Sequence, residues 1–562
     1  MTATAGEDAA GLPRPAPAAD PGPLDDRLYD LVEARFRRIL RDNPIAATYF
    51  GIHDYDDQLG DGGRETILAE LAADREHLTA TEGLDPAGLS ETARFERDLE
   101  IHNLRRSIFE ADQLRIWERR SLALDSVGDG VFLLFVRDHA PLAERLEAIT
   151  GRLEATPRHL DEARTRSSEP QVRLWQRIEI ESVAQLPALF DEVVAAGKDV
   201  LSATAQRRLE RAAASASTAV ELFGTWLEGT LPGGTDDWAI GRERHDALVE
   251  LRAFDGLDAD AILELGLRKL DEEHAARRAT AREIDPSASE TDVLAQVKAD
   301  HAPTFEAALE GYRDAMQRAR AHLIEHDLVT VPSDERIDVI ETPEYLRNVL
   351  PFAAYFSPAI FDANAKGIYV VTPSVHGDPN AMREHNRASI SNTSVHEAYP
   401  GHHLQLDVAR RNPSLTRQLA DAPEFVEGWG MYSELMMREH GFDDGPAFRL
   451  MLHTDAIWRA CRIILDVRMH RGELTVKQAT DFLVEHTGFE RENAAAEVQW
   501  YTYRPTYPMS YLLGRTLLLE LREAERQRLG DAFSLREFHD VLLRNGSLPI
   551  SFHRRLLSAG GA

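Results

Sequence analysis

Cysteine is almost absent from this sequence. The 562 residues include one cysteine, Cys461, so no disulfide can form within the chain. A metal site made of cysteines is excluded as well, and any metal must take its ligands from His, Asp or Glu. We expect Cys461 to be a small, buried, apolar side chain.

Basic residues are scarce relative to acidic ones. The sequence has 95 Asp and Glu residues against 64 Lys and Arg, which gives a formal net charge of −31 at pH 7. Such an acidic surface repels the phosphates of nucleic acids and the head groups of anionic lipids. We therefore expect neither a nucleic acid nor a membrane as a partner, while the oligomeric state stays open.

Long apolar runs are missing too. No run of 18 or more apolar residues occurs, and the N-terminus shows no basic start followed by an apolar segment. These absences predict neither a membrane span nor a signal peptide, and hence a cytoplasmic protein. Residues 1–24 are rich in Ala, Pro, Gly and Asp, a composition typical of a disordered tail.

The rest of the sequence is mostly of helical type. From Asp25 onward, apolar residues recur at helical spacing, and Ala, Leu, Glu and Arg are frequent. The first such set is Leu28, Leu31, Val32, Phe36, Ile39 and Leu40. No long Gly/Ser linker divides the chain, so we expect a single helical domain over residues 25–562.

One segment has the composition of a β-strand. Residues 367–373 read Gly-Ile-Tyr-Val-Val-Thr-Pro, a β-branched and aromatic run bounded by Gly and Pro. The fold class predicted is therefore all-α with a small β element. If this strand lies at a sheet edge near the site, its backbone can pair with an extended peptide, and Tyr369 becomes a candidate substrate contact.

Two histidine dipeptides lie close together near residue 400. His396-Glu397 is the only His-Glu pair of the sequence, and His402-His403 is the only His-His pair. In the zinc motif H-E-x-x-H, two His residues four positions apart face the metal and the Glu is the base. Here the fourth position is Pro400, so the simple motif is interrupted by Pro400-Gly401.

Helical geometry leaves the second ligand open. In an unbroken helix, His396 and His402 lie roughly 120° apart, while His396 and His403 nearly eclipse. Pro400 kinks a helix, and Gly401 permits unusual backbone dihedrals, so a bulge there can bring His402 to the metal face. Both His402 and His403 remain candidates on geometry alone.

A carboxylate is the expected third ligand, because a catalytic zinc site has three protein ligands and an open position for water. The best candidate is Glu427, on a helix that we predict to open near Pro423 and to end at Gly441. Glu424, one turn earlier, is its rival. Two glycines beside Glu427, at positions 428 and 430, cost helix stability and so indicate close packing.

The segment 396–405 resembles the signature of the bacterial family called domain of unknown function 885. Further similar segments cover nearly the whole ordered chain: 43–52, 427–434, 458–470 and 510–514. Two positions depart from that pattern. Residues 505–508 read Pro-Thr-Tyr-Pro where the family has Pro-Gly-Gln-Ala, and Trp500 stands where an Arg is expected.

The resemblance implies a fold and a set of roles. Members of the family resemble the zinc metallocarboxypeptidases of the thermophilic bacterial type, which in turn resemble angiotensin-converting enzyme. This implies a two-lobed helical metallopeptidase-like fold with a central cleft and one zinc per chain. The residues carried over are His396, His402 and Glu427 as metal ligands and Glu397 as the base. The family pattern favours His402 over His403.

Other residues suit substrate binding. Tyr511 is a neutral donor at pH 7 that can hydrogen-bond a developing oxyanion. Arg459, Arg462 and Arg504 can each clamp a substrate carboxylate. His470 is either a second donor or a cation at the end of a helix.

The function expected is that of a zinc-dependent hydrolase that cleaves peptides, as a carboxypeptidase or an oligopeptidase. The partner is then a peptide or a small amide substrate. Two alternatives remain open. One is a zinc amidohydrolase acting on a small non-peptide amide, and the other is a non-catalytic helical binding protein with a vestigial metal site.

Overall fold

The structure is a computed structural model. It describes residues 20–343, 353–362, 365–373 and 381–558, together with Leu12, Arg14, Pro15, Ala18 and Arg347. The disordered tail expected over residues 1–24 falls largely outside these residues. The first helix, α1 (Asp25–Asp42), begins at the residue where the helical pattern begins, and its apolar stripe is buried.

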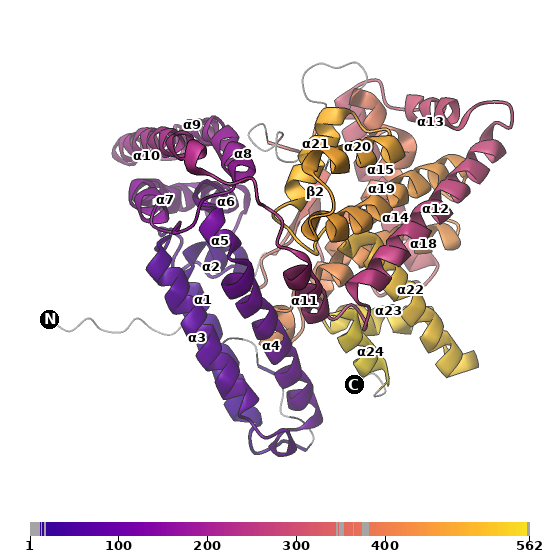
Figure 1. Ribbon diagram of the computed structural model, residues 1–562, viewed down its shortest axis with the longest axis horizontal. Coiled ribbons are helices and arrows are strands. Elements are labelled where there is room, and N and C mark those ends of the chain that lie inside the picture. Colours follow the sequence, from indigo (N-terminus) through magenta and orange to yellow (C-terminus); the bar gives the residue numbers. More distant parts are fainter. Residues whose placement is uncertain are drawn as a thin grey trace.

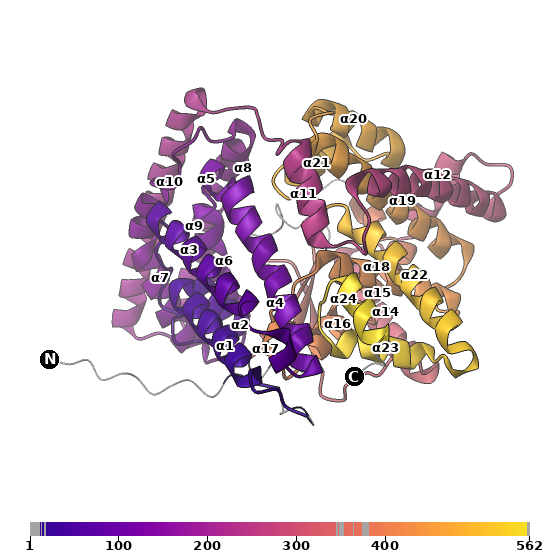
Figure 2. The same cartoon turned by 60° about the horizontal axis from the view of Figure 1, so that its bottom comes forward.

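The helices form two lobes, which lie side by side in Figure 1 and in Figure 2. The first lobe contains ten helices among the described residues, and its main core joins α6, α7, α9 and α10. They are α1 (Asp25–Asp42), α2 (Pro44–Phe50), α3 (Arg64–Glu82), α4 (Glu91–Phe109), α5 (Ile116–Arg119), α6 (Ala123–Val136), α7 (Leu142–Ala163), α8 (Arg173–Val183), α9 (Leu186–Gly197) and α10 (Ala203–Thr230).

The second lobe holds the largest core and the sheet. Its first helix, α11 (Arg242–Arg252), lies between the lobes (Figure 1). The others are α12 (Ala259–Ile284), α13 (Glu290–Ala299), α14 (Phe305–Glu325), α15 (Arg387–Glu397), α16 (His402–Ala409), α17 (Leu415–Gln418), α18 (Pro423–Glu439), α19 (Pro446–His470), α20 (Val476–Thr487), α21 (Arg491–Tyr501), α22 (Ser510–Leu529), α23 (Leu535–Arg544) and α24 (Ile550–Ser558).

Buried polar contacts join the two lobes. The Trp175 indole donates to the Thr502 hydroxyl at 2.8 Å, and the Arg417 guanidinium donates to the Glu96 carboxylate at 2.9 Å. Both contacts are buried, and hydrogen bonds of this kind are costly to leave unmade. The lobes are therefore fixed to each other by specific side chains as well as by the chain connection.

The small β element is a three-stranded sheet in the order β1-β3-β2. Its strands are β1 (Ile337–Glu341), β2 (Ala353–Phe356) and β3 (Gly367–Val371), with β1 parallel and β2 antiparallel to β3. The strand predicted over 367–373 is confirmed as β3, and the all-α fold class with a small β element is confirmed with it.

The expectation that this strand offers a free edge is wrong. β3 is the central strand and is buried at every residue, so its backbone pairs on both sides. An unbroken apolar run is typical of a strand with both faces covered, and it does not say whether the strand lies at an edge. Tyr369 is fully buried, and its ring packs edge-on against Tyr312 with centroids 5.9 Å apart.

Candidate metal centre

The metal helix expected around residue 400 is two helices. α15 ends at Glu397 and α16 begins at His402, with a tight turn between them. A Cβ added to Gly401 would lie 1.7 Å from the His396 carbonyl oxygen, so only glycine fits there. The Pro-Gly insertion thus breaks the helix, where we expected a kink or bulge within it.

The break brings two histidines and one glutamate together. Nε2 of His396 lies 3.7 Å from Oε2 of Glu427, and Nε2 of His402 lies 3.3 Å from the same oxygen. The two imidazole rings are perpendicular, at 89° with centroids 4.7 Å apart. Ligand atoms on one tetrahedral zinc lie about 3.3 Å apart, so this spacing suits a single ion.

Two glycines of α18 allow this approach. A Cβ at Gly430 would lie 2.6 Å from the His396 ring, so glycine leaves room for the imidazole. A Cβ at Gly428 would lie 2.5 Å from the backbone of Gly514 on α22, so glycine also lets α18 and α22 pack closely. The close packing that the sequence indicated at these two positions is confirmed.

The rival ligand, Glu424, belongs to different surroundings. It is fully buried, and that burial raises its pKa to about 7, while Arg252 and Arg106 partly offset the effect. The group of side chains that meets at His396 and His402 includes Glu427 and not Glu424. One helical turn therefore separates a buried acid at the lobe interface from the carboxylate of the candidate metal centre.

Outer hydrogen bonds orient two of the three ligands. Nδ1 of His396 donates to Glu434 at 2.7 Å, which turns Nε2 toward Glu427. The Tyr507 hydroxyl donates to Oε1 of Glu427 at 2.8 Å, which leaves Oε2 facing the histidines. A carboxylate behind a ligating histidine fixes the tautomer and the ring orientation in metal sites.

The electrostatics of the group favour a cation. Burial alone would lower the pKa of His396, but hydrogen bonds to Glu427 and Glu434 outweigh it and raise the pKa to about 10. Burial alone would raise the pKa of Glu427, yet His402 and His396 hold it well below its usual range. The carboxylates therefore keep positive charge at the position where a metal would bind.

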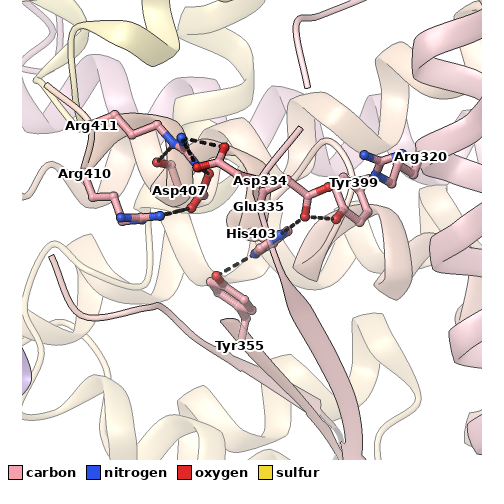
Figure 3. Close-up of polar contacts among 9 residues, drawn as sticks. All are labelled: Arg320, Asp334, Glu335, Tyr355, Tyr399, His403, Asp407, Arg410 and Arg411. Carbon is pink, nitrogen blue, oxygen red and sulfur yellow. Dashed lines mark hydrogen bonds and ion pairs between the residues drawn. The ribbon is translucent and has the colours of Figure 1, made fainter. Parts of the chain in front are cut away.

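His403 is committed to other partners (Figure 3). Its Nε2 lies 2.9 Å from the Glu335 carboxylate, and its Nδ1 lies 2.9 Å from the Tyr355 hydroxyl on β2. The Tyr399 hydroxyl donates to the same glutamate at 2.5 Å. With both ring nitrogens used, His403 anchors α16 to the sheet, and the geometry places His402 beside Glu427.

The predicted base, Glu397, is the last residue of α15 and is partly exposed. Its carboxylate is close enough to raise the pKa of His396, which it follows in the chain. Its charge also acts on Tyr369, because burial, then Tyr312 and then Glu397 hold the pKa of that phenol above its usual range. Glu397 thus adjoins the ligand His396 in the chain and is not one of the three converging ligands.

The predicted substrate residues fall into two sets. Burial, followed by the negative charge of Glu427, raises the pKa of Tyr511 above its usual range. The Arg462 and Arg459 guanidiniums lie 4.5 Å and 6.0 Å from the Tyr511 ring centre. The structure thus brings Tyr511, Arg459 and Arg462 together.

Arg504 and His470 are not brought to this group. Arg504 is exposed, and its charge acts on Asp129 of the first lobe. His470 is buried, which lowers its pKa to about 4, and its Nε2 lies 3.0 Å from the Tyr501 carbonyl oxygen. His470 is thus a neutral residue that supports the backbone before the 502–509 loop.

Tyr507, whose hydroxyl donates to the ligand Glu427, was not predicted from the sequence. Its loop is held by Thr506, whose backbone has φ = 67° and whose N–H donates to Asp466 at 3.0 Å. Arg252 donates to the Thr506 hydroxyl at 3.0 Å. The available signal was the departure of residues 505–508 from the family pattern, which marked this loop as unusual.

A second group of similar composition lies in the first lobe. His53, Asp56 and His139 bring their ligand atoms within 4.8 Å of one another. The Nδ1 of His53 lies 2.8 Å from Oδ2 of Asp56, and the Nε2 of His139 lies 3.4 Å from the same oxygen. No pattern in the sequence indicated this group, because its members come from two separate loops.

The family model described as "Bacterial protein of unknown function (DUF885)" matches residues 44–557. The chain belongs to this family. The signature at 396–405 thus identified the family from the sequence. None of the curated proteins matches the chain.

Two solved structures share the fold of this DUF885 chain. One is a "putative lipoprotein of unknown function" from Shewanella oneidensis, with 22% identity, 94% of this chain and 99% of that chain covered, and a TM-score of 0.77. The other is a "putative lipoprotein" from Colwellia psychrerythraea, with 18% identity, 96% and 99% coverage, and a TM-score of 0.83. At these identities the likeness shows the fold alone.

We predicted that no segment of the chain spans a membrane. In the part of the chain that the structure describes, every helix is too short or too polar to cross a bilayer. The cytoplasmic location stays a prediction.

Proposed function

We propose that this chain is a zinc-dependent hydrolase that cleaves amide bonds, with peptides as its substrates. One observation carries the proposal. His396, His402 and Glu427 converge from three helices on one point, and Glu397 directly follows the first of these ligands at the end of α15. Two His and one Glu with an adjacent free carboxylate is the arrangement of zinc peptidases.

The donor set fits zinc. Two imidazole nitrogens and a carboxylate oxygen are ligands that zinc accepts, and three protein ligands leave a position open. Glu434 accepts from Nδ1 of His396, so Nε2 is the nitrogen that would bind a metal in place of a proton. When bound, zinc would supply Lewis-acid chemistry that activates water and polarises a carbonyl.

The chain's own residues would move the protons. In amide hydrolysis, the water oxygen adds to the carbonyl carbon and the carbon–nitrogen bond breaks. The Glu397 carboxylate takes one proton from the water and delivers it to the leaving amine, so the products are an acid and an amine. No other reactant is needed for this balance.

Tyr511 would stabilise the charge that develops on the carbonyl oxygen. Because burial and the Glu427 charge raise its pKa above the usual range, the phenol keeps its proton at neutral pH. A protonated hydroxyl donates a hydrogen bond to an oxyanion. Tyr507 is less suited to this task, because its hydroxyl already donates to Glu427.

The test combines metal analysis with a peptide-library digest. Purified protein should contain one zinc per chain by elemental analysis, and mass spectrometry should detect cleaved peptides. Glu397→Gln should keep its zinc and fold while turnover falls on the order of 10²- to 10⁴-fold, the range of a lost acid–base group.

Two outcomes would reject the proposal. A protein that binds no zinc, even after zinc is supplied, would favour the binding protein with a vestigial site. A zinc-loaded protein that hydrolyses acylated amines but no peptide in the library would favour the small-amide hydrolase. Near wild-type turnover in Glu397→Gln would remove that residue from the role of base.

A further inference from the structure

Arg459, on α19, is a largely buried cation whose hydrogen-bond capacity is unused. Its side chain is 15% exposed, and its Nε and Nη1 are buried without a hydrogen-bond partner. Its ion pair, with Asp455, spans 3.6 Å from Nη1 to Oδ1. Among the residues that the structure describes, Arg459 is the one arginine with two such nitrogens.

The aspartate next to it makes no hydrogen bond with Arg459, because Nη1 and Oδ1 are 3.6 Å apart. The neighbouring arginine has one nitrogen without a hydrogen-bond partner, Nη1, but Arg462 donates to Glu497 at 2.9 Å and to the Tyr501 hydroxyl at 3.2 Å. Arg459 is therefore the guanidinium of this pair that is available to an added anion.

Aromatic rings hold both arginines in place. The Arg459 and Arg462 guanidiniums lie 3.9 Å and 4.2 Å from the centre of the Trp458 ring. Such stacking fixes a guanidinium while leaving its N–H edge available for a bidentate contact with a carboxylate. The rings of Trp458 and Tyr511 are both partly exposed, so this region is not sealed within the core.

The arginine is connected to the metal group through two tyrosines. The Arg459 guanidinium lies 6.0 Å from the Tyr511 ring centre, and the Tyr511 ring centre lies 6.2 Å from that of Tyr507. The Tyr507 hydroxyl in turn donates to Glu427 at 2.8 Å. Arg459 therefore lies beside Tyr511, the proposed oxyanion donor, so a substrate carboxylate bound there would belong to a residue close to the scissile bond.

We propose that Arg459 binds the free α-carboxylate of the residue released from the substrate. The substrates are then peptides or N-acyl amino acids cleaved at their C-terminal amide bond, as by a carboxypeptidase. This inference rests on the proposed hydrolase function and gives its direction of cleavage. Arg462 and Trp458 position the guanidinium, and neither needs to touch the substrate.

The kinetic test compares a blocked dipeptide having a free C-terminal carboxylate with its C-terminal amide. Wild-type kcat/KM should be on the order of 10²-fold higher for the acid, the size expected for a charge-assisted bidentate contact. Arg459→Met keeps an apolar stem on Trp458 and should bring the ratio close to one. Arg459→Lys should give an intermediate ratio, since it keeps the charge and loses the fork.

A matched control lies on the same helix. Arg449 is a partly exposed arginine of α19 that pairs with Glu283 at 2.7 Å. Arg449→Gln should leave the acid-to-amide ratio unchanged, and the wild type, this control and Arg459→Met should all hold equal zinc. A third substrate, an amidated peptide with Glu as its last residue, separates an α-carboxylate from an acidic side chain. It should be cleaved as slowly as the plain amide.

A binding arm keeps the inference testable if no hydrolysis is seen. By calorimetry, N-acetyl-L-leucine should bind wild type at least tenfold more tightly than N-acetyl-L-leucinamide, and Arg459→Met should abolish the difference. Equal handling of acid and amide by wild type would overturn the inference while leaving the hydrolase intact. Preferential acid binding without turnover of any substrate would reject the hydrolase and keep the carboxylate site.

Discussion

Two groups in this protein have the same composition, two histidines and one carboxylate, yet their geometries differ. In the second lobe, the rings of His396 and His402 are perpendicular, at 89°. In the first lobe, the rings of His53 and His139 are stacked, with an interplanar angle of 6° and centroids 3.8 Å apart. An imidazole lone pair lies in the ring plane, so two stacked rings cannot both point at one ion about 2 Å away.

The two groups also differ in whether a neighbouring arginine balances the negative charge of the carboxylate. Asp56 accepts from the Thr48 hydroxyl at 2.6 Å and lies 3.8 Å from Nη2 of the fully buried Arg152. Its negative charge is therefore already balanced, and a dication beside that arginine would be repelled. Glu427 has no arginine in its ion pairs among the described residues and lies near a further acid, Glu434. Ring orientation and unbalanced negative charge, more than composition, distinguish a metal centre.

The largest expected effect is loss of zinc from one group alone. His396→Ala should reduce zinc from one per chain to near zero at micromolar protein, because three ligands become two. The matched His139→Ala should keep one zinc per chain. Elemental analysis after gel filtration measures both. Zinc loss in His139→Ala at full folding would mean that the stacked pair also binds metal, and the comparison would fail.

The two adjacent histidines of α16 sharpen the comparison within one site. His402→Ala should release zinc, while His403→Ala should keep it, because the His403 nitrogens are used by Glu335 and Tyr355. Elemental analysis decides between them, and circular dichroism controls for folding. The reverse result would mean that α16 presents its other face to the metal.

A smaller effect is expected behind the metal ligands. Glu434→Gln removes the charged acceptor from Nδ1 of His396 and should weaken zinc affinity about 10- to 100-fold, the usual cost of losing such a partner. Competition with a chromophoric chelator measures this change. Glu439→Gln, later on the same helix and paired with Arg522, is the control. An unchanged affinity in Glu434→Gln would show that this carboxylate does not orient His396.

Local sequence signals predicted the parts of the structure that depend on neighbours in the chain. The apolar stripe predicted α1, and Pro423 with Gly441 predicted the bounds of α18 to within two residues. The His-Glu and His-His pairs indicated the segment that carries two converging histidines. Each of these features rests on spacing along one helix or on a turn residue, which a single sequence contains.

Contacts between distant segments were not predictable in this way. Glu335 meets His403 across 68 residues, and the group around Asp56 joins residues from two loops. The edge strands β1 and β2 were missed because neither Ile-Asp-Val-Ile-Glu nor Ala-Ala-Tyr-Phe is an unbroken β-branched run like that of β3. The place of β3 at the centre of the sheet follows from those two partners, so one strand alone did not reveal it.

The smallest expected effect on the metal centre comes from changing Asp56 of the first-lobe group. This change should lower the stability of the fold and leave the metal centre as it is. Asp56→Asn should leave zinc content and turnover unchanged but reduce the free energy of unfolding by about 3 kcal/mol, because Arg152 is left buried without its counter-charge.

Burial would raise the pKa of Asp56, but hydrogen bonds from His139, His53 and Thr48 hold it far below the usual value. The stabilisation is thus present above the ordinary Asp pKa of about 4 and is lost as the pH falls through the lower folded-state pKa. Urea unfolding at pH 7 should separate wild type from Asp56→Asn, and the gap should narrow at pH 3. Equal urea midpoints at pH 7 would show that Asp56 does not stabilise this lobe.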